Sequence, residues 1–279
     1  RYGELRCKAK CLRGTDITLA IPSVGATENA ILAACGAEGT SVIYNAAREP
    51  EIVDLQALLR SMGARVNGAG GSIITVEGGA ALHGCTHRVI GDRIVCATYL
   101  CAAAAAGGEV RLTGVDYRAV STVALSLAES GCEIRSEADA VSLRSHGALR
   151  SVRPVRTAPY PGFPTDAQPV LMAALLRSEG CTVFVENIFE NRYRHVDELS
   201  RMGAEIRVAG RVAVVNGVRT LHGAAVKCTD LRGGAALVIA GLSAEGTTRV
   251  TELTHIDRGY DAIERDLAAL GAQIRRETT

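Results

Sequence analysis

The pattern of apolar and polar positions repeats four times along the chain. The first of two glycine markers occurs as AEGTSVI, AGGEVRL, SEGCTVF and AEGTTRV, with glycines 69, 72 and 66 residues apart. The second occurs as MGARV, SGCEI, MGAEI and LGAQI, always 23–25 residues after the first. Two markers that stay in register over four copies indicate an internal repeat of about 70 residues.

Each copy predicts the same order of elements. A polar residue precedes an apolar helical stretch, as in TDAQPVLMAALLRSEG, and the first glycine is expected to end that helix. The run CTVFVEN predicts a strand, and YRHVDELSRMGA predicts an amphipathic helix closed by the second glycine. Two alternating strands, as in AEIRVAG and RVAVVNG, complete the unit. The chain is therefore expected to be an α/β (α+β) protein of repeated α-β-α-β-β units in compact domains.

The two ends of the sequence are out of phase with this repeat. Residues 2–13 (YGELRCKAKCLR) resemble the closing hairpin of a unit, and the last copy stops at AQIRRETT before such a hairpin. The phase predicts that sequence is missing upstream and that the missing part completes the last unit. A degenerate terminal unit is the alternative.

Composition narrows the class of protein. The 279 residues are 47% hydrophobic, which is enough for a sizeable core, and the net charge of +1 without a Lys/Arg run argues against a nucleic-acid-binding surface. The longest apolar stretch, residues 94–107, is too short to cross a bilayer. Nine cysteines without a CxxC motif indicate reduced core residues of a cytoplasmic protein, and six scattered histidines argue against a metal site.

The polar residues at the four predicted helix starts are the first candidates for a site. They lie 14–16 residues before the first glycine of each copy and are Ser23, Asp92, Asp166 and Asp230. Each suits a helix N-cap, but capping does not explain the proline-bearing stretches before some of them. Repeated helix starts gathered at a cleft between domains would form an anion site. In SVGATEN, Ser23, Val24 and Gly25 open a helix whose free N–H groups could hold a diphosphate.

Arginines recur at loop positions of the repeat. Arg48, Arg192 and Arg258 follow predicted strands, and Arg232 follows a predicted cap in TDLRGG. Each could be an ordinary surface arginine. Their recurrence in loops on a rigid scaffold favours binding of phosphate or carboxylate, which the planar guanidinium suits.

Taken in order, these motifs resemble those of one enzyme family. SVGATEN, NAAREPEIVD, GDRI, FPTD, FENR, TDLR, AEGTT and HIDRGY look like the motifs of the UDP-N-acetylglucosamine 1-carboxyvinyltransferases, the enolpyruvyl transferases that open peptidoglycan synthesis. The resemblance extends over nearly the whole chain. It implies a two-domain inside-out α/β barrel with three units per domain, an active site between the domains, and no metal or organic cofactor.

The resemblance also implies the reaction and its residues. The enolpyruvyl group of phosphoenolpyruvate moves to the 3-hydroxyl of UDP-N-acetylglucosamine, and phosphate is released. Asp166 is the expected general base, Asp230 lies near the reacting centre, and Arg258 acts with Arg232 on the phosphate and carboxylate of phosphoenolpyruvate. The expected substrate-binding residues are Ser23, Val24, Gly25, Ile188, Arg232, Arg192 and Asp92.

The same resemblance implies a domain division and a missing part. Residues 1–90 would be the remaining part of the first, UDP-sugar-side domain, and residues 91–279 the second domain. The reactive cysteine of the family would lie upstream of residue 1, so no cysteine here is given that role. The chain alone is expected to be inactive, with a separate chain or segment supplying the missing part. Ala167 and the Gly233–Gly234 pair depart from the family pattern. These departures bear on the expected local packing and not on the expected chemistry.

Two alternatives stay open. The chain could be a truncated, non-catalytic sugar-nucleotide-binding homologue, or half of a split enzyme that needs a partner chain. A shikimate enolpyruvyl transferase would keep the fold, but SVGATEN and HIDRGY speak against it. Neither nucleic acid nor membrane is expected as a partner.

Overall fold

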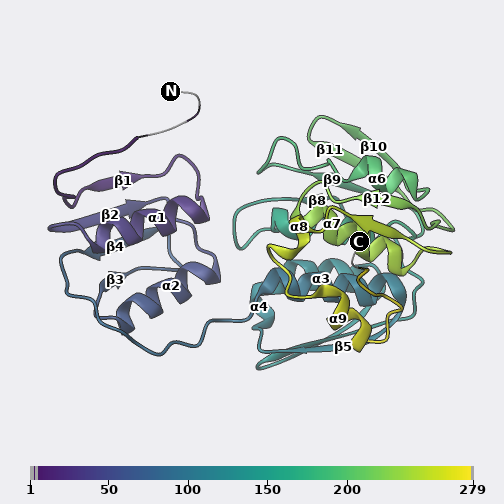
Figure 1. Cartoon of the computed structure of the whole chain (residues 1–279), viewed down its shortest axis with the longest axis horizontal. Helices are drawn as coiled ribbons and strands as arrows, with labels where there is room; N and C mark the ends of the chain where they lie inside the picture. The colour runs from purple at the N-terminus through teal and green to yellow at the C-terminus, as the bar shows by residue number, and fades with distance from the viewer. Residues whose placement is uncertain (1–2, 4–5, 278–279) are drawn as a thin grey trace. The chain divides into compact units, whose positions relative to one another are not determined.

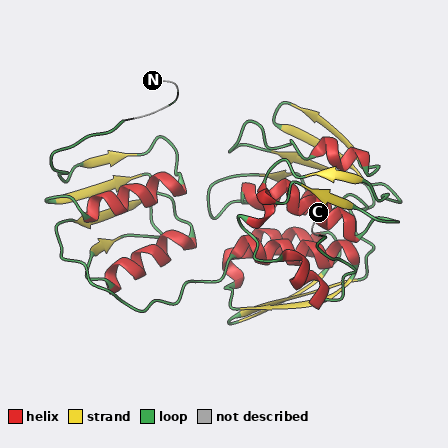
Figure 2. Cartoon of the chain, viewed as in Figure 1, coloured by secondary structure: helices red, strands yellow, loops and turns green. Residues whose placement is uncertain are grey.

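The chain is organised as two compact units of mixed helices and strands (Figure 1, Figure 2). The computed structural model describes residue 3 and residues 6–277. One unit comprises the chain up to Ile90 together with Pro159–Pro161. The other comprises Gly91–Ala158 and Gly162–Thr279.

The first unit is a four-stranded sheet with two helices packed against it. Its elements are β1 (Asp16–Thr18), α1 (Val24–Cys35), β2 (Thr40–Tyr44), α2 (Pro50–Ser61), β3 (Arg65–Asn67) and β4 (Ile73–Glu77). The strand order is β1-β2-β4-β3, with β1 parallel to β2 and the other pairs antiparallel. Alternate strand residues face one side of a sheet, so Ile43, Ile74 and Val76 join Ile31 of α1 and Ile52 of α2 in one core.

The second unit contains the remaining three copies of the repeat. The second copy has α3 (Arg93–Ala106), β5 (Gly108–Thr113), α4 (Tyr117–Glu129), β6 (Glu133–Glu137) and β7 (Ala140–Ser145). The third has β8 (Val155–Arg156), the 3-10 helix η1 (Thr165–Ala167), α5 (Gln168–Ala174), β9 (Cys181–Val185), α6 (Val196–Arg201), β10 (Glu205–Ala209) and β11 (Val212–Asn216). The fourth has β12 (Ala225–Lys227), α7 (Leu231–Leu242), β13 (Arg249–Thr251), α8 (Thr254–Asp257) and α9 (Ile263–Ala269).

The predicted α-β-α-β-β order is confirmed in the first three copies. The sheets of the second and third copies run β5-β7-β6 and β8-β9-β11-β10, the same arrangement as in the first unit. Three copies add a short strand before the first helix: β1, β8 and β12 each pair in parallel with the strand that follows that helix. These strands have only two or three residues, too few to show an alternating pattern in the sequence.

The second glycine of each copy ends a helix, as predicted. All four have a positive φ between 91° and 111°: Gly63, Gly131, Gly203 and Gly271. In each copy the N–H of the next residue donates to the carbonyl five residues earlier, as Ala204 does to Leu199 at 3.2 Å. This is the hydrogen bond of a Schellman C-cap, which requires the left-handed conformation that glycine adopts without strain.

The prediction for the first glycine was wrong. Gly39, Gly180 and Gly246 lie four to six residues beyond the helix. Gly39 and Gly180 lead directly into the next strand, Gly246 lies three residues before β13, and Gly108 is the first residue of β5. The helices end earlier because the chain must turn before it can enter the sheet. The glycines serve that turn with φ values from 85° to 125°.

The first helices of the last three copies form the centre of the second unit. Helices α3, α5 and α7 pack against one another. All seven residues of α5 are buried, as are ten of fourteen in α3 and eight of twelve in α7. Helices that are apolar on all sides must be enclosed, so the strands lie around them (Figure 2). In α1, the equivalent helix of the first unit, only four of twelve residues are buried.

The N-terminal segment differs from the prediction. Residues 6–12 form no strand, and Arg13 makes only an isolated bridge to Glu38. Residues 6–12 are all exposed, so no apolar face holds them to a sheet. Residues 2, 4 and 5 of the predicted hairpin lie outside the described part of the chain. Among the described residues no helix combines the length and the apolar character needed to cross a bilayer.

Candidate functional site

Three of the four predicted cap residues cap their helices. Ser23, Asp92 and Asp230 each accept a backbone N–H from two or three residues ahead. The distances are 3.4 Å for Ser23, 2.7 and 2.9 Å for Asp92, and 3.1 and 2.8 Å for Asp230. These bonds satisfy amides at the helix start that have no partner within the helix.

Asp166 is the exception, and the prediction of a cap there was wrong. It lies inside the 3-10 helix η1 and makes no cap hydrogen bond. Pro169 occupies the first turn of α5 and has no N–H to donate to a capping side chain. The Asp166 carboxylate instead accepts from Arg192 Nη2 at 2.7 Å and lies 3.5 Å from Arg232 Nη2. The fold thus places this carboxylate between two arginines.

Both arginines are held by neighbouring elements. Arg232 lies in the first turn of α7, with its guanidinium 5.4 Å above the ring of Tyr260, whose hydroxyl is 2.8 Å from Thr98 Oγ1 of α3. Arg192 lies in the loop between β9 and α6 and also donates to the carbonyl of Thr165 at 3.1 Å. Their side chains are only 11% and 14% exposed. Three of their N–H-bearing atoms are buried without a hydrogen-bond partner among the described residues: Nε and Nη1 of Arg232 and Nε of Arg192.

The charged and unpaired donors beside Asp166 favour an anion. Burial lowers the pKa of Arg232, but Tyr260, Asp166 and Asp92 raise it, and the net shift is upward. Arg232 therefore stays charged. Two buried guanidinium groups share the partly exposed Asp166 carboxylate and keep N–H donors that have no partner among the described residues. Carboxylate and phosphate oxygens match such donors in strong, charge-assisted hydrogen bonds.

Arg258 lies in the loop that follows α8. Its side chain is exposed and makes no hydrogen bond or ion pair with any other described residue. A Cβ at Gly259 would come within 2.9 Å of the Leu231 side chain, so this loop packs closely on the first turn of α7. The start of α7 thus carries Arg232 and lies against the loop of Arg258.

Ile188 lies in the loop that also carries Arg192. The backbone N–H groups of Ile188 and Phe189 donate to the buried carboxylate of Glu186 at 2.8 and 3.0 Å. The Phe189 ring lies 5.6 Å from the guanidinium carbon of Arg192. Sequence reasoning missed Glu186; the available signal was an acidic residue at the end of the apolar strand CTVFVEN.

His195 is a second residue that the sequence analysis missed. It is fully buried, and neither ring nitrogen has a hydrogen-bond partner among the described residues. Burial lowers the pKa of His195 to about 4, although the charge of Asp230 opposes that shift. The imidazole is therefore neutral at pH 7. A Cβ at Gly233 would lie 2.8 Å from Asp230 Oδ2 and 2.9 Å from His195 Cβ, so glycine at this position allows all three to pack.

The predicted residues fall into both units. Ser23, Val24 and Gly25 belong to the first unit, where they form the start of α1. Gly25 is exposed, and an added Cβ there would meet no atom within 4 Å. Arg48 also belongs to the first unit. The remaining candidates belong to the second unit, where contacts join Asp166 to Arg192 and Arg232.

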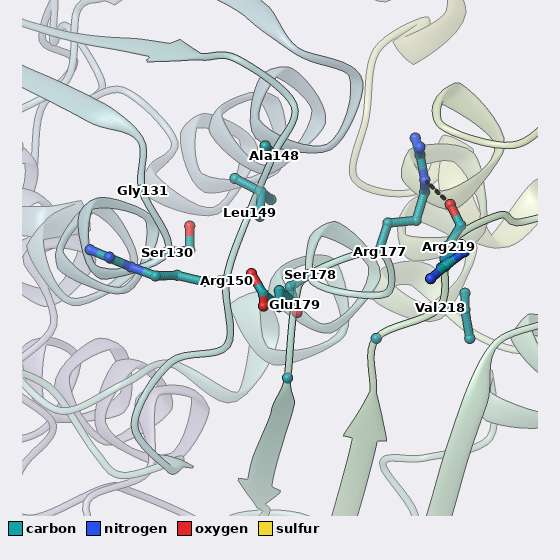
Figure 3. A pocket seen from close by; sticks show the side chains of 12 residues that line it. Ser130, Gly131, Ala148, Leu149, Arg150, Arg177, Ser178, Glu179, Val218 and Arg219 are labelled. Atoms are coloured by element: carbon teal, nitrogen blue, oxygen red, sulfur yellow. Dashed lines mark hydrogen bonds between the residues drawn. The ribbon is translucent and has the colours of Figure 1, made fainter.

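A recess of about 620 Å³ lies at the other end of α5 from Asp166 (Figure 3). Its arginines are Arg150, Arg177 and Arg219. Arg177 donates to the carbonyls of Arg219 and Ser243, both at 3.3 Å, and Arg150 donates to the carbonyl of Glu129 at 2.9 Å. These bonds tie consecutive copies of the repeat together. No buried unpaired donor lines this recess among the described residues, which distinguishes it from the Asp166 site.

The sequence of the chain matches a known family over most of its length. The family described as EPSP synthase (3-phosphoshikimate 1-carboxyvinyltransferase) matches residues 2–267. The chain belongs to this family of enolpyruvyl transferases. No group of three or more His, Cys, Asp or Glu side chains that could hold a metal ion occurs in the described part of the chain.

Relatives within the enolpyruvyl transferases are about half identical to the chain. The UDP-N-acetylglucosamine 1-carboxyvinyltransferase 2 of Caldanaerobacter subterraneus subsp. tengcongensis is 50% identical over 275 residues, which cover 99% of this chain and 66% of the relative. The UDP-N-acetylglucosamine 1-carboxyvinyltransferase of Gluconacetobacter diazotrophicus is 52% identical over 265 residues, which cover 95% of this chain and 63% of the relative. The chain thus spans slightly less than two thirds of the length of these relatives.

Solved structures of enolpyruvyl transferases share the fold. The enolpyruvyl transferase NikO from Streptomyces tendae has a TM-score of 0.85 and 28% identity, covering 96% of this chain and 66% of that one. EPSP synthase from Acinetobacter baumannii has a TM-score of 0.73 and 20% identity, covering 96% and 64%, and is similar in fold alone. The predicted α/β fold class of the enolpyruvyl transferase type is therefore confirmed.

Proposed function

We propose that the chain carries residues of an enolpyruvyl transferase that uses phosphoenolpyruvate and UDP-N-acetylglucosamine in the cytoplasm. Relatives with about half of their positions identical carry the corresponding name. The observation that supports the proposal most is the pair of buried arginines beside Asp166, with N–H groups that lack a partner in the described chain. Phosphoenolpyruvate offers both a phosphate and a carboxylate to such donors.

The proposed chemistry is an addition followed by an elimination. Asp166 accepts the proton of the sugar 3-hydroxyl, the hydroxyl oxygen bonds to C2 of phosphoenolpyruvate, and C3 takes up a proton. Loss of a proton from the resulting methyl group then restores the double bond as phosphate leaves. A carboxylate is a weak base near pH 7, so its placement between Arg192 and Arg232 has to supply much of the effect.

The other candidate residues take supporting roles in this proposal. Arg232 and Arg258 bind the phosphate and carboxylate of phosphoenolpyruvate, and Arg192 holds Asp166. Asp230 uses its carboxylate to cap α7, which supports a role in placing Arg232. The remaining substrate-binding residues are Ile188 and Asp92 for the sugar nucleotide and Ser23, Val24 and Gly25 for its diphosphate.

The arginine site is tested by titrating phosphoenolpyruvate into the 279-residue chain in a calorimeter. The unsubstituted chain should bind it, and Arg232→Gln should weaken binding by at least about tenfold, since a charge-assisted hydrogen bond contributes roughly 1.5–3 kcal/mol. Arg219→Gln removes an exposed arginine of the recess at the other end of α5 and should leave the affinity unchanged. Absence of binding, or equal losses in both variants, would contradict the proposal.

Turnover is tested separately by phosphate release with both substrates present. Release of phosphate that depends on the UDP-sugar supports the transferase reaction in this chain. Heat of binding with UDP-N-acetylglucosamine but no phosphate release would instead support a non-catalytic sugar-nucleotide-binding protein, or a chain that needs a partner segment.

A further inference from the structure

Glu186 is a buried carboxylate whose role the proposed reaction does not include. It lies just after β9 and is 1% exposed. No lysine or arginine of the described chain forms an ion pair with it. Burying an unpaired charge is costly unless hydrogen bonds replace its hydration. Four donors perform that replacement: the hydroxyls of Thr157 and Thr165 and the N–H groups of Ile188 and Phe189.

The two oxygens of Glu186 hold different segments. Oε1 accepts from Thr157 Oγ1 at 2.9 Å and from the N–H groups of Ile188 and Phe189 at 2.8 and 3.0 Å. Oε2 accepts from Thr165 Oγ1 at 3.0 Å. One carboxylate therefore links the end of β8, the loop after β9 and the 3-10 helix η1.

These segments carry the two partners of the closest ion pair at the site. Thr165 directly precedes Asp166, and Arg192 lies three residues beyond Phe189 in the loop. Arg192 donates to the Thr165 carbonyl at 3.1 Å and to the Asp166 carboxylate at 2.7 Å. A shift of either segment relative to the other would separate the donor from both acceptors.

We propose that Glu186 is a positioning residue for the Asp166 site. Its Oε1 fixes the loop that carries Arg192, and its Oε2 fixes the turn that carries Asp166. Its charge strengthens all four hydrogen bonds, because bonds to an ionised acceptor are roughly twice as strong as neutral ones. The catalytic meaning of this placement rests on the proposed function, whereas the placement itself does not.

The placement is tested without any ligand by NMR on the 279-residue chain. Two reporters are used: hydrogen exchange of the Ile188 and Phe189 amides, and restricted rotation of the Arg192 guanidinium. Glu186→Gln keeps the shape of the side chain but removes the charge, and should speed exchange of both amides about tenfold. It should also release the Arg192 guanidinium into faster rotation.

Thr165→Val separates positioning from loop stability. It removes only the bond to Oε2, so the two amides should stay protected while the Arg192 guanidinium rotates faster. Thr165→Ser restores the hydroxyl and should restore the restricted rotation. Thr182→Val is the matched control. It removes a buried hydroxyl of β9 that accepts from the N–H of Val152 and makes no bond to Glu186, so it should change neither reporter.

A link to function follows from phosphoenolpyruvate titrations of the same variants. Thr165→Val should weaken binding about three- to tenfold relative to Thr165→Ser. If no variant and not even the unsubstituted chain binds phosphoenolpyruvate, the proposed function fails while the NMR result still decides the role of Glu186. Unchanged amide exchange in Glu186→Gln, an unchanged Arg192 signal in Thr165→Val, or free rotation of Arg192 in the unsubstituted chain would overturn the positioning role.

Discussion

The starts of α5 and α7 occupy the same position in the repeat but use their aspartates differently. At α7, Asp230 accepts two backbone N–H groups and caps the helix. At α5, a 3-10 turn precedes the helix, Pro169 offers no N–H, and Asp166 pairs with Arg192 and Arg232. The same residue type therefore serves helix stability in one copy and the candidate reaction in the other.

This difference shows what a repeated fold offers for function. A capping carboxylate has its oxygens directed at its own helix, so few acceptor positions remain for a substrate. Removing the cap from one copy leaves a carboxylate with free acceptor positions on a rigid helix start. The neighbouring copy supplies the partner, because Arg232 in the first turn of α7 reaches the Asp166 carboxylate. The two helix starts thus act as a pair.

The largest expected effect concerns His195, which lies beside the cap of α7. Burial lowers the pKa of His195 to about 4, below the value of about 6.5 for an exposed histidine. The folded state then binds fewer protons than the unfolded state, so the stability contributed above pH 6.5 is lost as the pH falls towards 4. The slope approaches about 1.4 kcal/mol per pH unit. Urea unfolding should show that the free energy of unfolding falls by about 2–3 kcal/mol less between pH 7 and pH 4 in His195→Leu than in the unsubstituted chain.

The exposed His146 provides the control for this pH dependence. Its side chain is 71% exposed, so His146→Gln should leave the acid sensitivity as it is. If His195→Leu and the unsubstituted chain lose stability equally on acidification, burial does not keep the His195 imidazole neutral in the folded chain.

A smaller effect is expected when Gly233, in the first turn of α7, is replaced by alanine. The new Cβ would lie 2.8 Å from Asp230 Oδ2 and 2.9 Å from His195 Cβ. Overpacking of this kind costs roughly 1–3 kcal/mol, which outweighs the gain of about 1 kcal/mol in helix propensity. Thermal or urea unfolding should therefore show a net loss.

Gly25→Ala in α1 is the matched substitution, because a Cβ there meets nothing within 4 Å. It should stabilise its own unit by up to about 1 kcal/mol. Equal stabilisation by both alanines would mean that the α7 start is looser than the geometry around Gly233 implies.

The parts predictable from the sequence are those with local causes. The second glycines end their helices because the left-handed conformation is a property of one residue and its neighbours, as at Gly203. The ion pairs of Asp166 depend on partners from two other segments, so they appear only once the fold brings Arg192 and Arg232 together. Glu186 was missed for the same reason: an acidic residue after an apolar strand gives no sign of its four donors.

Replacing Asp230 tests the capping half of the comparison. Asp230→Ala removes the side-chain acceptor and should lower the free energy of unfolding by about 1 kcal/mol. Asp230→Asn keeps an oxygen in the same place and should stay within a few tenths of a kcal/mol of the unsubstituted chain. Urea unfolding of the two variants gives the difference directly. Equal stability of alanine and asparagine at this position would remove Asp230 as a cap.

The smallest effect is expected for the same pair of substitutions at Asp166. Neither alanine nor asparagine replaces a cap there, because Asp166 accepts no backbone N–H in the described structure. The carboxylate is 41% exposed, so both variants lose ion pairs that solvent already weakens, an effect of about 1 kcal/mol or less. The two variants should therefore differ from each other by less than about 0.5 kcal/mol, half the gap expected at Asp230. A gap as large as that at Asp230 would show that Asp166 caps α5 in solution, and the contrast between the two helix starts would disappear.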